Sequence, residues 1–448
     1  MEIVIVGGGL VGTTLAGKLS REGHDVSLIE RRPERAAELS RSLDVRVVEG
    51  NGATAGALRA AGAEEASLVV ACTESDEVNF VTGRIAASMF KVRNVVVRLR
   101  ETEHQEAFAH LSRGDRVEIA CVNPEAAAVE KIVSLFEVPG ALDVNDFMGG
   151  ALRVAGFPIR AGSEFAERPV LDMRLFFAET PSLVVAVQRG DRVIVPHGGE
   201  VLRAGDIAYF ALARSDLENF LELMEARANA SHKVLVAGAT HLGLTLARRL
   251  EQMGFAVTLL EPDTALAQRA AEELPGALVV SGALPQLLDE EEIETVAAFV
   301  AVSPDHEDNL VGCLLAKRMG AARAFALVDN PSLASLIGEI AIDAIISPRL
   351  LSIGLTMQHV QGRRVKKVAA LFGDRVEVLE AEVVQGAPVT RAPIAELDLP
   401  RGVLVVAVQR EGALRMPRGE DRATPGDRIL LVAETAETAA AAEFIAPG

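Results

Sequence analysis

The stretch "VIVGGGLVGTTLAGKLSREGHDVSLIE", residues 4–30, decides the first part of the fold. It reads as an apolar strand, a glycine turn, a helix and a second strand that ends in an acid. Gly7, Gly9 and Gly12 satisfy the G-x-G-x-x-G spacing directly after the strand. The first glycine permits a tight turn, the second lets the backbone approach a pyrophosphate, and the third allows close packing of helix on strand. In this order, the elements predict a dinucleotide-type cleft.

The residues around this turn are the first candidate contacts for a nucleotide. The helix that starts at Leu10 and Val11 would offer free N–H groups and a positive dipole end to phosphates. Glu30 ends the second strand, where a carboxylate accepts hydrogen bonds from ribose hydroxyls. Arg31 follows and could select a 2′-phosphate, but Glu30 would repel that group. The sequence therefore favours NAD(H) or an adenine nucleotide over NADP.

The same order of elements returns in "VLVAGATHLGLTLARRLEQMGFAVTLLE", residues 234–261. An offset of 231 aligns Glu30 with Glu261. Thr240 stands where the second glycine of the turn is expected, and its side chain would obstruct close approach of a phosphate. We interpret this copy either as an altered nucleotide site that keeps Glu261 or as a purely structural repeat.

A second repeated piece follows each glycine turn. "LVVAVQRGDRVIVPHGGEVLRAGD" at 183–206 matches "LVVAVQREGALRMPRGEDRATPGD" at 404–427, and both alternate short strands with polar turns. The polar stretch 225–233 is the expected linker between the two halves. We expect four domains, named N1, C1, N2 and C2, at 1–140, 141–228, 231–362 and 363–448.

Alternation of elements predicts the fold class. In N1, apolar strands alternate with alanine-rich helices, a pattern typical of a parallel doubly wound sheet. The C pieces have short strands and one helix, which indicates a small α+β module. We therefore predict an α/β protein with two Rossmann-like domains, each followed by a small α+β domain. The strands expected in N1 are 2–6, 25–30, 45–48, 67–72, 94–98 and 117–120.

Composition excludes several classes of protein. The chain has 448 residues, so we expect roughly two to four domains. Its formal net charge of −18 opposes general nucleic-acid binding, which needs a basic surface. Cys72, Cys121 and Cys313 form neither a disulfide framework nor metal-ligand spacing, which favours a reducing cytoplasm and predicts no metal site. No apolar stretch reaches the ~20 residues that span a bilayer, and the strand at 2–6 leaves no room for a signal peptide.

A search for catalytic residues finds no constellation. The sequence has no H-E-x-x-H, G-x-S-x-G, Walker A or C-x-x-C motif. Its eight histidines are scattered, and none accompanies a candidate nucleophile. A dehydrogenase also needs an acid or base near the nicotinamide. We therefore predict a protein that is not an enzyme, and an NAD-dependent oxidoreductase remains the alternative.

The run "VVEGNGATAGALRAAGAEEASLVVACTESDEVNF", residues 47–80, is more specific than the glycine turn. It resembles the RCK/KTN domain of potassium-channel and potassium-transporter regulators. The matching features are Gly50-Asn51 after the third strand, the Leu-x-x-Ala-Gly of 58–62, and a Thr-x-x-Asp-x-x-Asn motif. That last motif consists of Thr73, Asp76 and Asn79.

With two tandem copies, essentially the whole chain is similar to the tandem-RCK subunits of bacterial Trk potassium-uptake systems. The resemblance implies a ring of RCK domains built by a homotetramer. It also implies docking on a TrkH-type membrane subunit at the inner face of the cell membrane, and gating by NAD(H), ATP or ADP.

The resemblance also assigns roles to individual residues. The three glycines would hold phosphates and Glu30 the ribose, while Asn51 would lie beside the adenine. Cys72 and Thr73 would line the cleft near the phosphates, although the apolar surroundings of Cys72 are also typical of a small core residue. Arg98 would contact a phosphate or a neighbouring subunit, with an edge salt bridge as the alternative. Asp76 and Asn79 are expected to fix the next helix.

Two segments, 124–137 and 348–361, each begin at a proline and carry an apolar face at helical spacing. They resemble the crossover helix by which RCK lobes pair. The alternative is that each helix packs within its own lobe.

Overall fold

The computed structural model describes residues 1–113, 117–190, 192–224, 231–329, 342–360, 365–371 and 375–445. Most of the predicted linker, 225–230, lies outside these ranges, as do residue 361 and the predicted start of C2 at 363. The chain packs as two compact units. One comprises Met1–Ala127 with Pro348–Gly362, and the other comprises Ala128–Ser347 with Arg363–Gly448.

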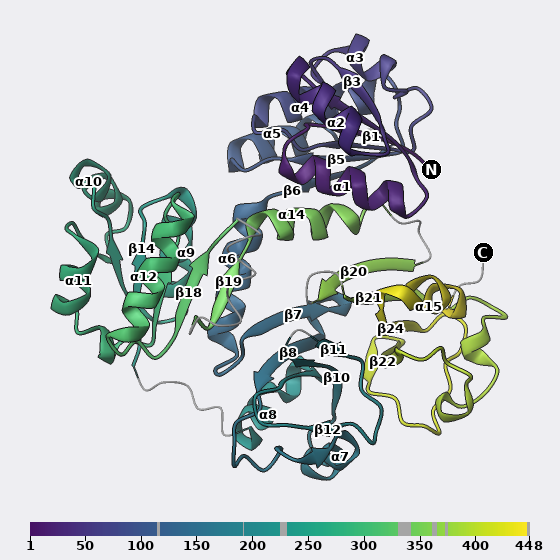
Figure 1. Cartoon of the computed structure of the whole chain (residues 1–448), viewed down its shortest axis with the longest axis vertical. Coiled ribbons are helices and arrows are strands. Elements are labelled where there is room, and N and C mark those ends of the chain that lie inside the picture. Colours follow the sequence, from purple (N-terminus) through teal and green to yellow (C-terminus); the bar gives the residue numbers. More distant parts are fainter. Residues whose placement is uncertain are drawn as a thin grey trace. The chain divides into compact units, whose positions relative to one another are not determined.

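The first unit contains a six-stranded parallel sheet with the order β3-β2-β1-β4-β5-β6, as in a doubly wound dinucleotide-binding fold (Figure 1). This confirms the predicted fold class for N1. Its strands are β1 (Glu2–Val6), β2 (Asp25–Glu30), β3 (Arg46–Glu49), β4 (Leu68–Ala71), β5 (Asn94–Arg98) and β6 (Glu118–Val122). Its helices are α1 (Leu10–Arg21), α2 (Pro33–Ser42), α3 (Ala55–Ala60), α4 (Asp76–Ser88) and α5 (Thr102–Leu111).

Hydrophobic spacing explains how these elements pack. The central strands are nearly continuous runs of Val, Ile, Leu and Ala that are buried on both faces, as parallel sheets require. Helix α1 buries Val11, Leu15 and Leu19, which recur every four residues on one face. Two apolar clusters result, and the glycine turn lies between β1 and α1 at the carboxyl edge of the sheet.

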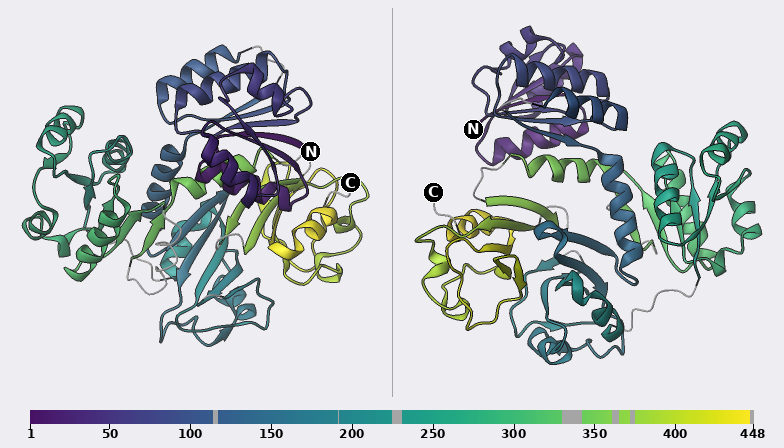
Figure 2. Two further views of the ribbon diagram at one scale, coloured as in Figure 1. Left: turned by 45° about the horizontal axis from the view of Figure 1, so that its top comes forward. Right: turned by 180° about the vertical axis from the view of Figure 1, so that it is seen from behind.

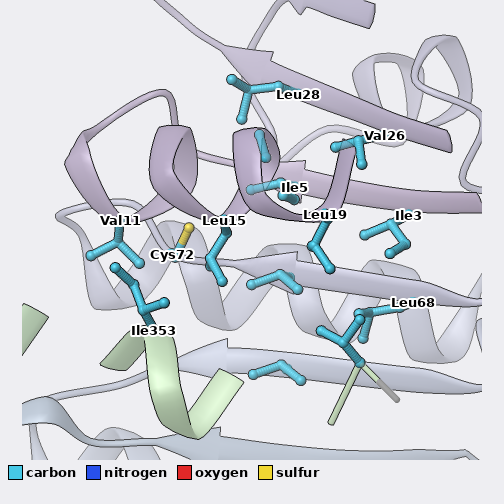
Figure 3. Close-up of a cluster of buried hydrophobic side chains, with 14 of the residues drawn as sticks. Ile3, Ile5, Val11, Leu15, Leu19, Val26, Leu28, Leu68, Cys72 and Ile353 are labelled. Atoms are coloured by element: carbon cyan, nitrogen blue, oxygen red, sulfur yellow. The ribbon is translucent and has the colours of Figure 1, made fainter. Parts of the chain in front are cut away.

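The core of N1 is completed by a helix from the second half of the chain. Helix α14 (Pro348–Met357) packs along α1. Figure 3 shows Ile353 of α14 beside Val11 of α1, and Met357 and Val360 belong to the same buried cluster. The core of N1 therefore depends on residues from the end of the segment predicted as N2, 231–362.

Helix α6 (Pro124–Glu137) mirrors this arrangement in the second unit. It follows β6 of N1 in the chain, yet Phe136 packs edge-on against Phe325 and Phe255, with ring centroids 5.6 and 5.1 Å apart. The Arg323 guanidinium donates to the carbonyls of Leu135 and Ala141 at 2.8 and 2.7 Å. Each crossover helix thus packs on the lobe of the other copy (Figures 1 and 2). The alternative, in which each crossover helix packs within its own lobe, is therefore wrong.

The sheet of N2 repeats that of N1. Its six parallel strands have the order β16-β15-β14-β17-β18-β19. They are β14 (Lys233–Ala237), β15 (Ala256–Leu260), β16 (Leu278–Val280), β17 (Ala298–Ala301), β18 (Ala324–Leu327) and β19 (Ala344–Ile346). The helices described in this lobe are α9 (His241–Gln252), α10 (Thr264–Glu273), α11 (Leu284–Glu290) and α12 (His306–Arg318).

The C modules are small antiparallel sheets that share an apolar core with each other. Both contain an equivalent ion pair between a buried aspartate and a more exposed arginine, Arg189–Asp206 in C1 and Arg410–Asp427 in C2, each at 2.8 Å. The C1 sheet has β7 (Asp143–Phe147), β8 (Leu152–Pro158), β10 (Ser182–Arg189), β11 (Arg192–Ile194) and β13 (Ile207–Ala213), with α7 (Met173–Phe176) and α8 (Leu217–Leu223) beside it. The C2 sheet has β20 (Val365–Leu371), β21 (Val376–Glu382), β22 (Val403–Arg410), β23 (Ala413–Arg415) and β24 (Arg428–Glu434), followed by α15 (Thr438–Ile445).

Candidate nucleotide-binding site

Two glycines of the first turn are required by its geometry. Gly7 has a φ of +116°, and a Cβ there would lie 3.1 Å from the backbone nitrogen of Thr73. A Cβ on Gly12 would lie 1.9 Å from the carbonyl oxygen of Gly7. Gly7 thus permits the turn, and Gly12 lets α1 lie directly against it.

Gly9 has a different environment, because a Cβ there would meet nothing within 4 Å. Gly9 is the N-cap residue of α1, and no side chain caps this helix. The N–H groups of a first helical turn have no partner inside the helix, so those of Leu10 and Val11 are available to an anion. The Leu10 side chain is exposed and that of Val11 is buried, so Leu10 lies at the open edge of this space.

Glu30 holds the turn from the end of β2. Its side chain is buried, and Oε2 accepts a hydrogen bond from Gly8 N–H at 3.0 Å. Oε1 accepts from Arg32 N–H at 2.9 Å and pairs with Arg32 Nε at 3.3 Å. Each carboxylate oxygen can accept more than one hydrogen bond, so this arrangement is compatible with a ribose hydroxyl as a further donor. The neighbouring Arg31 is exposed.

A cation that the sequence analysis did not identify also reaches the turn. Arg35, in the first turn of α2, donates from Nε to the carbonyl of Gly8 at 3.4 Å. Its Nη1 pairs with Glu38 at 2.7 Å. The only sequence signal was its position one helical turn after the strand that ends in Glu30. Arg35 therefore places a guanidinium, paired with Glu38, against the backbone of the residue that precedes Gly9.

A buried asparagine ties together the ends of β4 and β5. Asn79 Oδ1 accepts hydrogen bonds from Thr73 N–H and Thr73 Oγ1 at 2.8 and 2.7 Å. Asn79 Nδ2 donates to the carbonyls of Thr73 and Arg98, both at 2.9 Å. Asp76 accepts from the backbone N–H groups of Arg100 and Glu101 at 2.6 and 3.0 Å. Through these bonds Asp76 and Asn79 attach the start of α4 to the segments that follow β4 and β5. The residue that caps α4 is Ser75.

Arg98 is a largely buried cation at the carboxyl end of β5. Its Nη2 donates to the Thr73 carbonyl at 2.8 Å, and its Nε is buried with no hydrogen-bond partner among the described residues. Burial lowers the pKa of the Arg98 guanidinium. Within the described ranges no carboxylate lies at ion-pair distance from it, which removes the edge salt bridge as an explanation. A half-buried guanidinium without a carboxylate partner, bonded to Thr73 next to the Gly7 turn, is a cation that suits a phosphate.

Two other residues predicted to line the cleft, Cys72 and Asn51, have different environments. The Cys72 side chain lies in the core behind the turn, with Sγ 3.5 Å from the Val6 carbonyl, so it does not line the cleft. Burial raises the pKa of this thiol to about 11. Small apolar neighbours, including Gly12, account for the burial. Asn51 is exposed after β3, where its Oδ1 accepts from Ala53 N–H at 3.0 Å.

The turn of N2 has nearly the same backbone but a different chemistry. Gly238 has a φ of +114°, and Glu261 accepts from Ala239 N–H at 2.8 Å, as Glu30 does from Gly8. However, Thr240 caps α9 with its own side chain. Its Oγ1 accepts from Gly243 N–H at 3.0 Å and donates to the Val302 carbonyl at 3.2 Å.

N2 also lacks the buried cation. Asn309 Nδ2 donates to the carbonyls of Ser303 and Leu327, both at 2.9 Å, just as Asn79 bonds to those of Thr73 and Arg98. Leu327 therefore stands where Arg98 stands in N1. In the parts of the chain that the structure describes, no cluster of three or more His, Cys, Asp or Glu side chains could hold a metal ion.

Comparisons with known proteins agree with this architecture. A model of the TrkA-N domain matches residues 3–117 and 234–348, and a model of the TrkA-C domain matches 154–225 and 378–446. The chain is 30% identical over 439 residues to the Trk system potassium uptake protein TrkA of Azorhizobium caulinodans, covering 97% of this chain and 96% of the relative. It is 31% identical over 440 residues to the protein of the same name from Halomonas elongata, covering 96% and 95%.

Solved structures support the fold. The GsuK RCK domain aligns with a TM-score of 0.62 at 17% identity and covers 100% of this chain and 95% of that one. The GsuK channel bound to NAD aligns with a TM-score of 0.61 at 16% identity and covers 100% and 79%. Tandem TrkA-N and TrkA-C domains, together with full-length relatives at this identity, place the chain in the TrkA family of Trk-system potassium uptake proteins.

Proposed function

We propose that this protein is the regulatory subunit of a Trk-type potassium transporter, and that a nucleotide bound in N1 controls uptake through a TrkH-type membrane subunit. The observation that carries the proposal is the open space at Gly9 in front of an uncapped helix. It is supported by the Arg98 guanidinium, which bonds to Thr73, a residue whose backbone lies against the Gly7 turn. Family membership supplies the link to potassium uptake. The chain would work in the cytoplasm, on the inner face of the membrane. None of the helices in the described ranges has both the length and the apolar composition of a bilayer span.

The ligand would be NAD(H), ATP or ADP. The N–H groups at the start of α1 would bind its phosphates, and Arg98 and Thr73 would flank them. Glu30 would accept from the ribose, and the loop at Asn51 would lie beside the adenine. The GsuK channel, which shares this fold, has been solved with NAD. No bond needs to break in this scheme, because the nucleotide acts as an effector.

We propose that ligand binding in N1 is transmitted to the rest of the protein by a movement of α1. A ligand can shift an equilibrium only through a difference in its affinity for two states. A phosphate at Gly9 would contact the first turn of α1, in which Val11 packs against Ile353 of α14. Helix α14 leads along the chain to C2. Movement of α1 on ligand binding would therefore act on the helix that precedes the last module in the sequence.

We further propose that four chains assemble into a ring and that the domains have the boundaries 1–140, 141–228, 231–362 and 363–448. The family resemblance supports the ring. The order of the matched domains supports the boundaries along the chain. By packing, however, residues 348–362 go with N1.

Calorimetric titration of the full chain with NADH, ATP and ADP tests the binding site. Gly9→Asp would place a carboxylate in the phosphate position, and we expect it to abolish binding. Gly56→Asp is a matched control, because Gly56 lies on the exposed face of α3 and a Cβ there also meets nothing within 4 Å. Equal affinity in wild type and Gly9→Asp would refute the site.

Potassium or rubidium flux tests the regulatory role. The chain would be added to vesicles that contain a Trk-type membrane subunit, with and without nucleotide. We expect flux to depend on nucleotide in wild type and Gly56→Asp but not in Gly9→Asp. If flux does not depend on nucleotide in any of the three proteins, the chain binds nucleotide without regulating transport, and the regulatory role is refuted. Substrate-dependent oxidation of NADH would favour the oxidoreductase instead.

A further inference from the structure

We propose that Thr240 decides which lobe takes the nucleotide, because its hydroxyl occupies in N2 the place that a ligand phosphate oxygen would occupy in N1. The chain would then bind one nucleotide, in N1 alone. This inference rests on the proposed function of N1 and concerns the other half of the molecule.

The comparison of the two turns carries the inference. Gly9 and Thr240 have almost the same backbone conformation, with φ −74° in both and ψ of −172° and 166°. The acid at the end of the second strand bonds to the residue before each of them at 3.0 and 2.8 Å. The two lobes therefore present the same helix N-terminus to the same cleft. They differ in what lies in front of that helix.

In N2 the space is filled by the protein itself. Thr240 Oγ1 lies 3.0 Å from Gly243 N, a donor of the first turn of α9, and gives its own proton to the Val302 carbonyl at 3.2 Å. Both hydrogen-bonding roles of the hydroxyl are thereby used. In N1 the equivalent donors have no side-chain acceptor, and the space beyond Gly9 is empty of protein atoms. A phosphate oxygen could reach the donors of α9 only by displacing a well-bonded hydroxyl.

Two further positions of N2 differ from those that would contact the ligand in N1. Leu327 supplies no charge where Arg98 supplies a cation, and Ala283 stands at the place of Asn51 after the third strand. Glu261 is kept, but its two oxygens bond to the N–H groups of Ala239 and Asp263 at 2.8 and 3.0 Å. We interpret Glu261 as a residue that holds the turn of N2. The turn of N2 therefore has the backbone shape of the N1 turn, but its side chains leave no place for a phosphate.

Binding stoichiometry of the full chain with ADP, measured by calorimetry and native mass spectrometry, tests the inference. We expect one ADP per chain in wild type, in Thr240→Ser, which keeps the hydroxyl, and in Leu327→Arg alone. The double variant Thr240→Gly with Leu327→Arg is expected to bind two. Two ADP per wild-type chain would overturn the inference, and so would a folded double variant that still binds one. A wild type that binds no nucleotide would instead refute the proposed function.

A transplant into N1 tests the role of the hydroxyl without relying on the double variant. Gly9→Thr should cap α1 as Thr240 caps α9, so ADP binding should be lost while the melting temperature without ligand stays at or above that of wild type. Gly9→Ala adds only a Cβ in open space and offers no acceptor to the helix. We therefore expect the Kd for ADP to be at least about tenfold lower in Gly9→Ala than in Gly9→Thr. Equal losses in the two variants would show that bulk alone decides, and the inference would fail.

Discussion

Replacing Arg98 by methionine should separate the recognition of phosphate from the recognition of adenosine. Methionine keeps an unbranched apolar stem of similar reach but removes the guanidinium. In the free protein that group has one committed donor, Nη2, which bonds to Thr73 at 2.8 Å, and one buried donor, Nε, that has no partner. A phosphate placed at the start of α1 would supply the missing acceptor.

The expected loss follows from the hydrogen-bond count. One hydrogen bond to a charged group contributes about 1.5–3 kcal/mol, so Arg98→Met should raise the Kd for ADP by roughly 10- to 150-fold. Fold stability should change by less than about 1 kcal/mol, because the lost bond to Thr73 is offset by removal of an unsatisfied buried donor. Adenosine, which has no phosphate, should bind to the variant as it does to wild type.

Competition calorimetry with ADP, NADH and adenosine is the appropriate assay. Leu327→Met is the matched control, since it changes the equivalent position of N2 and should leave all affinities unchanged. An unaltered Kd for ADP in Arg98→Met would refute the assignment. Equal weakening of ADP and adenosine would show that Arg98 shapes the cleft through Thr73 and does not bind the phosphate.

Three further predictions concern packing and reactivity in N1. Gly12→Ala should destabilise N1 by about 1–3 kcal/mol or more in thermal unfolding, because its Cβ would lie 1.9 Å from a backbone oxygen; Gly17→Ala in the same helix has room and should be neutral or stabilising. Ile353→Ala should lower the stability of N1 by about 2–5 kcal/mol, seen as faster amide exchange in α1; unchanged exchange would contradict the packing. Cys72, with its pKa raised to about 11 by burial, should resist alkylation at pH 8 and gain reactivity with rising pH, since more of the thiol becomes thiolate; rapid labelling at pH 8 would contradict it.

Local signals in the sequence sufficed for the elements of N1. The strand expected at 25–30 is Asp25–Glu30, and the strand expected at 94–98 is Asn94–Arg98. Proline, glycine and the alternation of apolar residues act over a few positions, so these boundaries can be read without knowing the rest of the fold. The glycine turn and Glu30 belong to the same class of signal.

Features that depend on distant contacts could not be predicted in this way. The packing of α14 on α1 brings together residues more than three hundred positions apart. An amphipathic pattern does not say which apolar surface a helix will cover. The position of Arg35 beside Gly8 depends on the packing of α2. The sequence indicated that Thr240 would obstruct the turn, but the bond from Gly243 N–H to its hydroxyl depends on the folded geometry. Cys72 had two possible roles, and burial decided between them.

The exchange of α6 and α14 has a consequence for how the two copies can diverge. If two identical chains traded these helices in a symmetric dimer, both turns would have to carry the same residue. Joining the copies in one polypeptide removes that constraint while each core still depends on the other copy's helix. A glycine can then be kept at position 9 and a threonine at position 240. The exchange also means that a half-chain cut between the copies would lack the helix that covers its Rossmann-like lobe, so we expect it to fold only when the other half, or a second copy, supplies that helix.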